Sequence, residues 1–192
     1  MTLANALTIS RLVLALVFFI LFQFDSTLMR DLALATMILA GLSDILDGYI
    51  ARAQQSLTTF GRIADAFVDK VLICGAFIFL IGQTDPDAHV RAWMVVVIVG
   101  REFLVNGLRT FAESRGVRFR ATILGKSKMF TQFVTICWIV LYLGHLVGHA
   151  WAEVVTIILV WATVILTAVT GAIYVYLAAA RGLLERNTTG AS

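Results

Sequence analysis

The sequence has few charged residues and few residues that interrupt helices. Only 14% of its 192 residues are charged, whereas soluble domains are about a quarter charged. A single proline, Pro86, leaves long helices possible almost everywhere in the chain. The two cysteines, Cys74 and Cys137, lie inside apolar runs, so we expect buried thiols without a disulfide or a catalytic role. The shortage of charge argues against a soluble protein.

Apolar runs occupy most of the chain. Hydrophobic residues make up 60% of it, and its mean hydropathy is +0.91. A helix needs roughly 20 apolar residues to cross the hydrocarbon core of a bilayer. Six segments meet this requirement, some with polar residues inside them: about 8–24, 30–50, 63–82, 90–111, 128–147 and 152–178. The sequence therefore predicts one all-α integral membrane domain over residues 1–192, with six transmembrane helices.

Lysine and arginine are distributed unevenly between the two ends of these spans, and this bias sets the expected orientation. Six spans place both termini on one side of the membrane. That side receives most of the basic residues, whereas the opposite side receives only Arg30 and Arg91. We therefore expect both termini to be cytoplasmic. The net charge of +3 suits anionic headgroups or phosphorylated substrates better than nucleic acid.

Four aspartates lie at the cytoplasmic ends of the second and third predicted spans. Asp44 and Asp47 are three residues apart and Asp65 and Asp69 are four apart, so each pair shares one helix face. The link between the spans is short, so the two pairs are expected to face each other. Four carboxylates together need a cation, and hard oxygen ligands favour Mg²⁺, Mn²⁺ or Ca²⁺. The pattern predicts one divalent ion, or two about 3.5–4 Å apart as in displacement at phosphorus.

Two glycines accompany the aspartates. Gly48 and Gly61 would let a ligand approach the helix backbone, although helix-packing glycines are equally common in membranes. For the aspartates, the alternative is that they are solvated acids at helix ends. This alternative is weaker, because Asp69 is followed by a long apolar run in which only Lys70 is charged.

The spacing of these residues resembles the signature of the CDP-alcohol phosphatidyltransferase family. Every fixed position of that signature is matched, by Asp44, Asp47, Gly48, Ala51, Arg52, Gly61, Asp65 and Asp69. The resemblance implies a six-helix membrane fold, usually a homodimer, with an active site that opens to the cytoplasmic face at the end of the bundle. It also implies two divalent ions, Mg²⁺ or Mn²⁺, and an acceptor alcohol that displaces CMP from CDP-diacylglycerol.

The resemblance assigns a role to each residue of the signature. It implies that the metal ligands are Asp44, Asp47, Asp65 and Asp69. It implies that Asp69 is also the general base toward the acceptor hydroxyl. It implies that the nucleotide is bordered by Asp47, Gly48, Ala51, Arg52 and Gly61. These roles are chemically consistent, because metal ions neutralise the charge that develops on the departing CMP.

The acceptor is indicated by other stretches. The segments "NALTISR", "GREFLVNGLRTFAESRG" and "ILGKSKMFTQ" are similar to bacterial members of the family that use glycerol 3-phosphate, which implies the bacterial inner membrane. Arg101 lies inside an apolar span, where an arginine is functional or ion-paired by default. Glu102 falls about 100° round the helix and is expected to be a structural partner of another group. The candidate ligands of the acceptor phosphate are Arg101, Arg109, Lys126 and Lys128, although cytoplasmic loops carry positive charge in any case.

Three alternative functions stay open at the level of the sequence. The same chemistry serves other acceptors, such as inositol phosphate, serine, or phosphatidylglycerol in cardiolipin synthesis. An intramembrane prenyltransferase also uses aspartate-rich helices, and a divalent-cation transporter would need acids near the middle of the membrane. His145 and His149 have a metal-compatible spacing, but we expect no acid near them and no metal site. Tyr174 is expected to be a packing or interfacial anchor.

Overall fold

The computed structural model of the chain is all-helical over the residues that it describes. These are residues 3–54, 59–82, 89–115 and 123–180, with side chains described for 9–44, 67–81, 89–115, 125 and 127–180. Within this part the helices are α1 Leu3–Leu21, α2 Thr27–Gln54, α3 Thr59–Gly82, α4 Ala92–Ser114, α5 Ile123–Leu141 and α6 Ala150–Ala180, with a π-helical turn, η2, at Tyr142–Leu146. The prediction of an all-α fold is confirmed for these residues.

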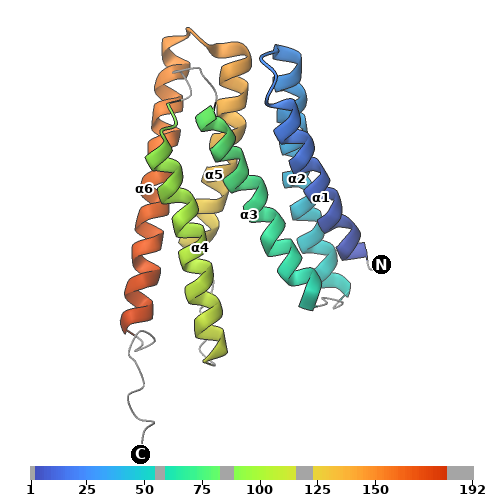
Figure 1. Cartoon of the computed structure of the whole chain (residues 1–192), viewed down its shortest axis with the longest axis vertical. Helices are drawn as coiled ribbons and strands as arrows, with labels where there is room; N and C mark the ends of the chain where they lie inside the picture. Colours follow the sequence, from blue (N-terminus) through green and yellow to red (C-terminus); the bar gives the residue numbers. More distant parts are fainter. Residues whose placement is uncertain (1–2, 55–58, 83–88, 116–122, 181–192) are drawn as a thin grey trace, which may run out of the picture.

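The helices run up and down in an elongated bundle (Figure 1). Helix α1 packs against α2 and α3, while α6 packs against α4 and α5, and α5 also contacts α2. Helix α1 begins and α6 ends toward the same end of the bundle. Because successive helices alternate in direction, four further helix termini lie at the same end of the bundle: the end of α2, the start of α3, the end of α4 and the start of α5.

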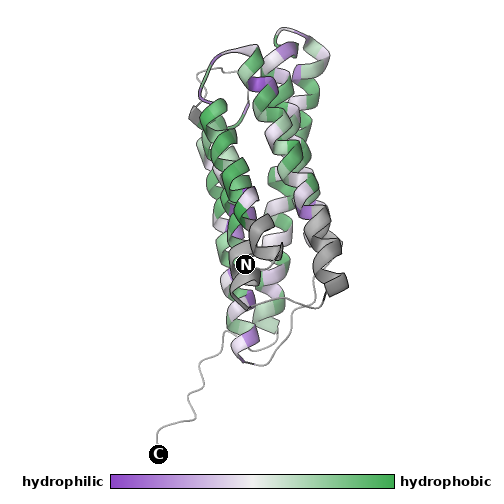
Figure 2. Cartoon of the chain, turned by 90° about the vertical axis from the view of Figure 1, so that its right-hand side faces the viewer, coloured by the Kyte–Doolittle hydropathy of each residue, from purple (hydrophilic) through white to green (hydrophobic). Residues whose placement is uncertain are grey.

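Apolar side chains both fill the bundle and cover its outside. Phe18, Phe77 and Ile136 are among the fully buried core residues, and large apolar side chains such as Val96 and Phe130 are about 70% exposed. Figure 2 shows hydrophobic residues along the helices, with hydrophilic residues gathered mainly toward the ends. Within the described part, Ser127–Leu146 and Ala150–Ala180 are long and apolar enough to cross a membrane. An apolar exterior of this kind is typical of a surface that contacts lipid or another protein.

Three hydrogen bonds that join a side chain of α5 to a side chain of α6 fix the register of this pair. They join Gln132 to Thr167 at 3.3 Å, Thr135 to Thr163 at 2.8 Å, and the Trp138 indole to Thr156 at 2.9 Å. Polar side chains inside an apolar bundle need partners, because an unsatisfied hydroxyl or amide is costly there. Lys128, near the start of α5, donates a hydrogen bond to Glu102 in the middle of α4.

The end of the bundle opposite to the start of α1 contains a histidine–aspartate hydrogen bond that the sequence did not predict. The ring of His145 lies 2.6 Å from Asp31 Oδ1, so the expectation that no acid lies near this histidine is wrong. Arg30 also donates a hydrogen bond to the Leu143 carbonyl oxygen in η2. These contacts tie the start of α2 to η2. The described residues contain no group of three or more His, Cys, Asp or Glu side chains arranged to hold a metal ion.

Candidate functional site

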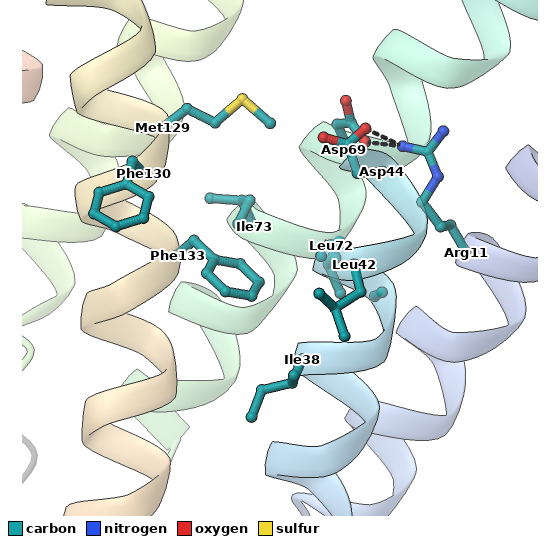
Figure 3. Close-up of a pocket in the computed structure, with 12 residues that line it drawn as sticks. Arg11, Ile38, Leu42, Asp44, Asp69, Leu72, Ile73, Met129, Phe130 and Phe133 are labelled. Carbon is teal, nitrogen blue, oxygen red and sulfur yellow. Dashed lines mark hydrogen bonds and ion pairs between the residues drawn. The ribbon is translucent and has the colours of Figure 1, made fainter. Parts of the chain in front are cut away.

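Two of the four signature aspartates meet at an arginine from a third helix. Arg11 of α1 donates hydrogen bonds from Nη1 to Oδ1 of Asp44 on α2 and to Oδ1 of Asp69 on α3, each at 2.7 Å (Figure 3). The Arg11 side chain is 1% exposed, whereas the two carboxylates are 35% and 29% exposed. The arginine therefore lies behind the acids, and the acids form the boundary between the bundle interior and its surroundings.

The remaining signature residues continue the same two helices. Asp47, Gly48, Ala51 and Arg52 belong to α2, and Gly61 and Asp65 belong to α3. Their side chains lie outside the described part of the structure, as does the side chain of Lys126 in α5. The structure thus gives the side-chain geometry of one aspartate from each predicted pair.

The chemistry of Asp44 and Asp69 suits a hard divalent cation. Both are carboxylates, they come from different helices, and their Oδ1 atoms are close enough to share one guanidinium nitrogen. Mg²⁺ and Mn²⁺ favour such oxygen donors. The residues present therefore fit the predicted metal, and the two aspartates are the described members of the predicted set of four ligands.

An apolar cavity of about 520 Å³ begins at these acids. Arg11, Asp44 and Asp69 line its polar end, and apolar side chains of α2, α3 and α5 line the rest (Figure 3). Those side chains include Ile38, Leu42, Leu72, Ile73, Met129, Phe130 and Phe133. Gly41 keeps α2 close to α5 on this cavity, because an added Cβ would lie 2.5 Å from the Phe133 ring. The cavity offers a charged end and an oily body, as an amphiphile requires.

A second cavity, of about 330 Å³, also has Asp69 in its lining. Its lining brings together Asp69 and three of the four predicted phosphate ligands, Arg101, Arg109 and Lys128. The arginines come from α4 and the lysine from α5, so residues distant in the sequence form one basic cavity. Because Asp69 lines both cavities, it stands at their junction.

A carboxylate compensates the basic residues of this second cavity. Glu102 Oε1 accepts hydrogen bonds from Lys128 Nζ and, at 3.3 Å, from Arg101 Nη1. All three side chains are at most 13% exposed. The prediction that Glu102 is a structural partner of another group is confirmed, and that group is Lys128.

Two residues of α6, Gly171 and Tyr174, contact Arg101. Gly171 leaves room for the arginine, because an added Cβ would lie 2.9 Å from Arg101 Cγ. One turn further on, the ring of Tyr174 lies 5.7 Å from Arg101 Cζ, within the range of a cation–π contact. Tyr174 also lines the basic cavity.

Sequence reasoning missed Arg11, Gly171 and Tyr174 as site residues. For Arg11 a signal was available, because an arginine in the first turns of an apolar helix is ion-paired or functional by default. Gly171 and Tyr174 gave no signal of their own. They are an ordinary small residue and an ordinary aromatic residue of an apolar helix, and only the neighbouring arginine distinguishes them.

Comparisons with known proteins show which sequences this chain resembles. A sequence model of the CDP-alcohol phosphatidyltransferase family matches residues 1–170. Proteins of Rickettsia bellii and Rickettsia typhi, both named CDP-diacylglycerol--glycerol-3-phosphate 3-phosphatidyltransferase, are 34% identical over 90% of this chain and over 92% and 94% of their own lengths. A Bacillus subtilis protein of the same name is 36% identical over 70% of this chain and 66% of its own length.

The ion pairs of Glu102 give a first prediction. Glu102→Gln should lower the free energy of unfolding by about 3 kcal/mol, because Lys128 and Arg101 stay buried beside an uncharged amide. Chemical unfolding of the purified protein in detergent micelles measures this difference. Glu113→Gln on the exposed side of α4 is the matched control and should change stability little. Equal stability of the two variants would contradict a stabilising Glu102.

Proposed function

The chain belongs to the CDP-alcohol phosphatidyltransferase family, and we propose that it transfers the phosphatidyl group of CDP-diacylglycerol to glycerol 3-phosphate, giving phosphatidylglycerophosphate and CMP. The observation that carries the proposal is the position of Asp69, which lines both an apolar cavity and a basic cavity. A lipid donor and a phosphorylated acceptor would then meet at one carboxylate. The names of the relatives give the same donor and acceptor.

The apolar cavity is suited to the lipid part of the donor. Its body is lined by α2, α3 and α5 side chains such as Leu42, Ile73 and Phe133, and burial of apolar chains against them is favourable by roughly 25 cal/mol per Å². The charged end of the cavity lies at Asp44 and Asp69. The cytidine diphosphate headgroup would lie there, bordered by the signature residues Asp47, Gly48, Ala51, Arg52 and Gly61.

The basic cavity is suited to the acceptor phosphate. Arg101 and Arg109 offer guanidinium groups that can bind phosphate through two parallel hydrogen bonds, and Lys128 adds a point charge. We include Lys126 in this set on its position at the start of α5. With its phosphate at these residues, the acceptor would present a hydroxyl toward Asp69 at the junction of the cavities.

The proposed reaction is one displacement at phosphorus. Asp69 accepts the proton of the acceptor hydroxyl while the hydroxyl oxygen forms a bond to the phosphorus that carries diacylglycerol, and the bond from that phosphorus to the CMP oxygen breaks. Two divalent ions, Mg²⁺ or Mn²⁺, would supply the positive charge that the departing CMP needs. Their ligands would be Asp44, Asp47, Asp65 and Asp69. The basic cavity orients the acceptor, and the apolar cavity holds the donor.

The proposal includes the membrane arrangement. Residues 1–192 would form one domain with six transmembrane helices in a bacterial inner membrane. Both termini would be cytoplasmic. The domain would be surrounded by membrane lipids and would form a homodimer. The apolar exterior and the two long apolar helices support a membrane location. The shared position of the acids and basic side chains toward the end where α1 begins supports one active site at the cytoplasmic face.

A panel of acceptors tests the function directly. Purified protein supplied with labelled CDP-diacylglycerol and Mg²⁺ should form phosphatidylglycerophosphate with glycerol 3-phosphate, because Arg101, Arg109 and Lys128 can bind its phosphate and the names of the relatives give this acceptor. Inositol phosphate, serine and phosphatidylglycerol are the competing acceptors, and thin-layer chromatography separates the products. Absence of label in the glycerol 3-phosphate product would overturn the proposal, and label with another acceptor would redirect it.

The role of Asp69 gives a second prediction for the same assay. Asp69→Asn should lower kcat by about 10²–10⁴-fold, because the amide cannot accept the proton of the hydroxyl. Binding of CMP, measured by calorimetry in detergent, should be largely retained. Asp25→Asn, at the other end of the bundle, is the control with unchanged turnover. A near-normal rate in Asp69→Asn would show that another group is the base.

The position of Arg101 gives a third prediction. Arg101→Ala should raise the KM for glycerol 3-phosphate about tenfold or more, because a charge-assisted hydrogen bond contributes about 1.5–3 kcal/mol. Gly171→Ala should also raise the KM for glycerol 3-phosphate, because the added Cβ displaces Arg101. Gly100→Ala should leave this KM unchanged, because its added Cβ meets open space. The KM for CDP-diacylglycerol should change less in each variant. Equal effects on both substrates would remove Arg101 from the acceptor site.

A further inference from the structure

The position of Arg11 raises the question of what this residue does when a metal ion binds. A guanidinium that is 1% exposed loses nearly all of its hydration, and this loss must be offset by strong partners. Its Nη1 donates to two carboxylates from two different helices. The contacts therefore hold α1, α2 and α3 together at one point, and they neutralise part of the negative charge that the aspartates bring there.

The same oxygen atoms are the ones that a divalent ion would need. Asp44 and Asp69 contact Arg11 through Oδ1, and both are predicted ligands. A divalent ion bound to these carboxylates would place two positive charges a few ångströms from a guanidinium, and like charges at that separation repel. Arg11 and the ion would thus both neutralise the negative charge of these carboxylates. Each would weaken the contacts that the other makes with them.

We propose that Arg11 is the resident counter-ion of Asp44 and Asp69 in the metal-free protein, and that a divalent ion competes with it for these carboxylates. This inference rests on the metal site of the proposed function. Arg11 keeps the three helices assembled before the metal ion arrives, and its contacts loosen when the ion binds. It is a positioning residue, because it acts on the ligands of the metal rather than on the substrates.

Arg30 provides a matched comparison within the same chain. It is an arginine in the first turn of α2, with an ion pair to Asp25 at 3.1 Å and a hydrogen bond to the Leu143 carbonyl oxygen. Asp25 is 76% exposed, and Arg30 lies at the opposite end of the bundle. The contacts of Arg30 contribute to stability alone, so their removal should have the same effect with and without metal.

Thermodynamic linkage turns the competition into a measurable quantity. If Arg11 stabilises the metal-free protein more than the metal-bound protein, it lowers the metal affinity by the corresponding factor. Removing the guanidinium should therefore do two things together. It should lower the stability of the metal-free protein, and it should tighten metal binding.

The experiment uses the full-length protein in detergent, without substrates. Wild type, Arg11→Gln and Arg30→Gln are unfolded thermally in EDTA and in saturating Mn²⁺, and Mn²⁺ binding is titrated by electron paramagnetic resonance. We expect Arg11→Gln to lower Tm more in EDTA than in Mn²⁺ and to lower the Kd for Mn²⁺ about tenfold, within the usual range of coupling between sites. Arg30→Gln should lower Tm equally in both conditions and leave the Kd unchanged.

Other outcomes would overturn the inference in distinguishable ways. An equal loss of Tm in both conditions with an unchanged Kd would make Arg11 a structural ion pair only, and weaker Mn²⁺ binding would mean that Arg11 helps the ligands bind metal. If Arg11→Gln does not fold, Arg11→Met is used, since it removes the charge but keeps an unbranched side chain that can pack in the same place, and an unchanged Kd again overturns the inference. Absence of Mn²⁺ binding in the wild type would instead refute the metal site of the proposed function.

Discussion

The arrangement of this protein depends on the compensation of carboxylate charge inside an apolar bundle. Asp44 and Asp69 approach each other from α2 and α3, and the buried guanidinium of Arg11 on α1 contacts both. Carboxylates at this depth are costly without a cation, and a cation at this depth is costly without carboxylates. Each group therefore requires the others, and the first three helices are joined at the point where the chemistry is proposed to occur.

The second ionic cluster extends the same principle to the other three helices. Glu102 contacts Lys128 and Arg101, linking α4 to α5, and α6 makes room for Arg101 through Gly171. The basic side chains are thereby kept in place around a cavity rather than folded away from it. Asp69 borders this cavity and the apolar one, so charge compensation also places the carboxylate at which the donor and the acceptor are proposed to meet.

Much of the fold and part of the site could be predicted from local pattern. The apolar runs predicted six helices in nearly the observed places, and the position of Glu102 beside Arg101 predicted a buried partner. The pairing of His145 with Asp31 was missed because the two residues are 114 positions apart. No local pattern indicates which ends of two distant helices come together. The contact of Gly171 with Arg101 escaped prediction for the same reason.

The sequence by itself determined the helices, the type of chemistry and the family. Apolar periodicity acts over a few residues, and the spacing of the aspartates is a property of two adjacent helices. The tertiary structure decided which cation compensates the acids and where the two cavities meet. Arg11 and Asp69 are 58 positions apart, and their contact exists only because α1 packs against both α2 and α3. That packing is set by the fit of whole helix surfaces, which no short stretch of the sequence encodes.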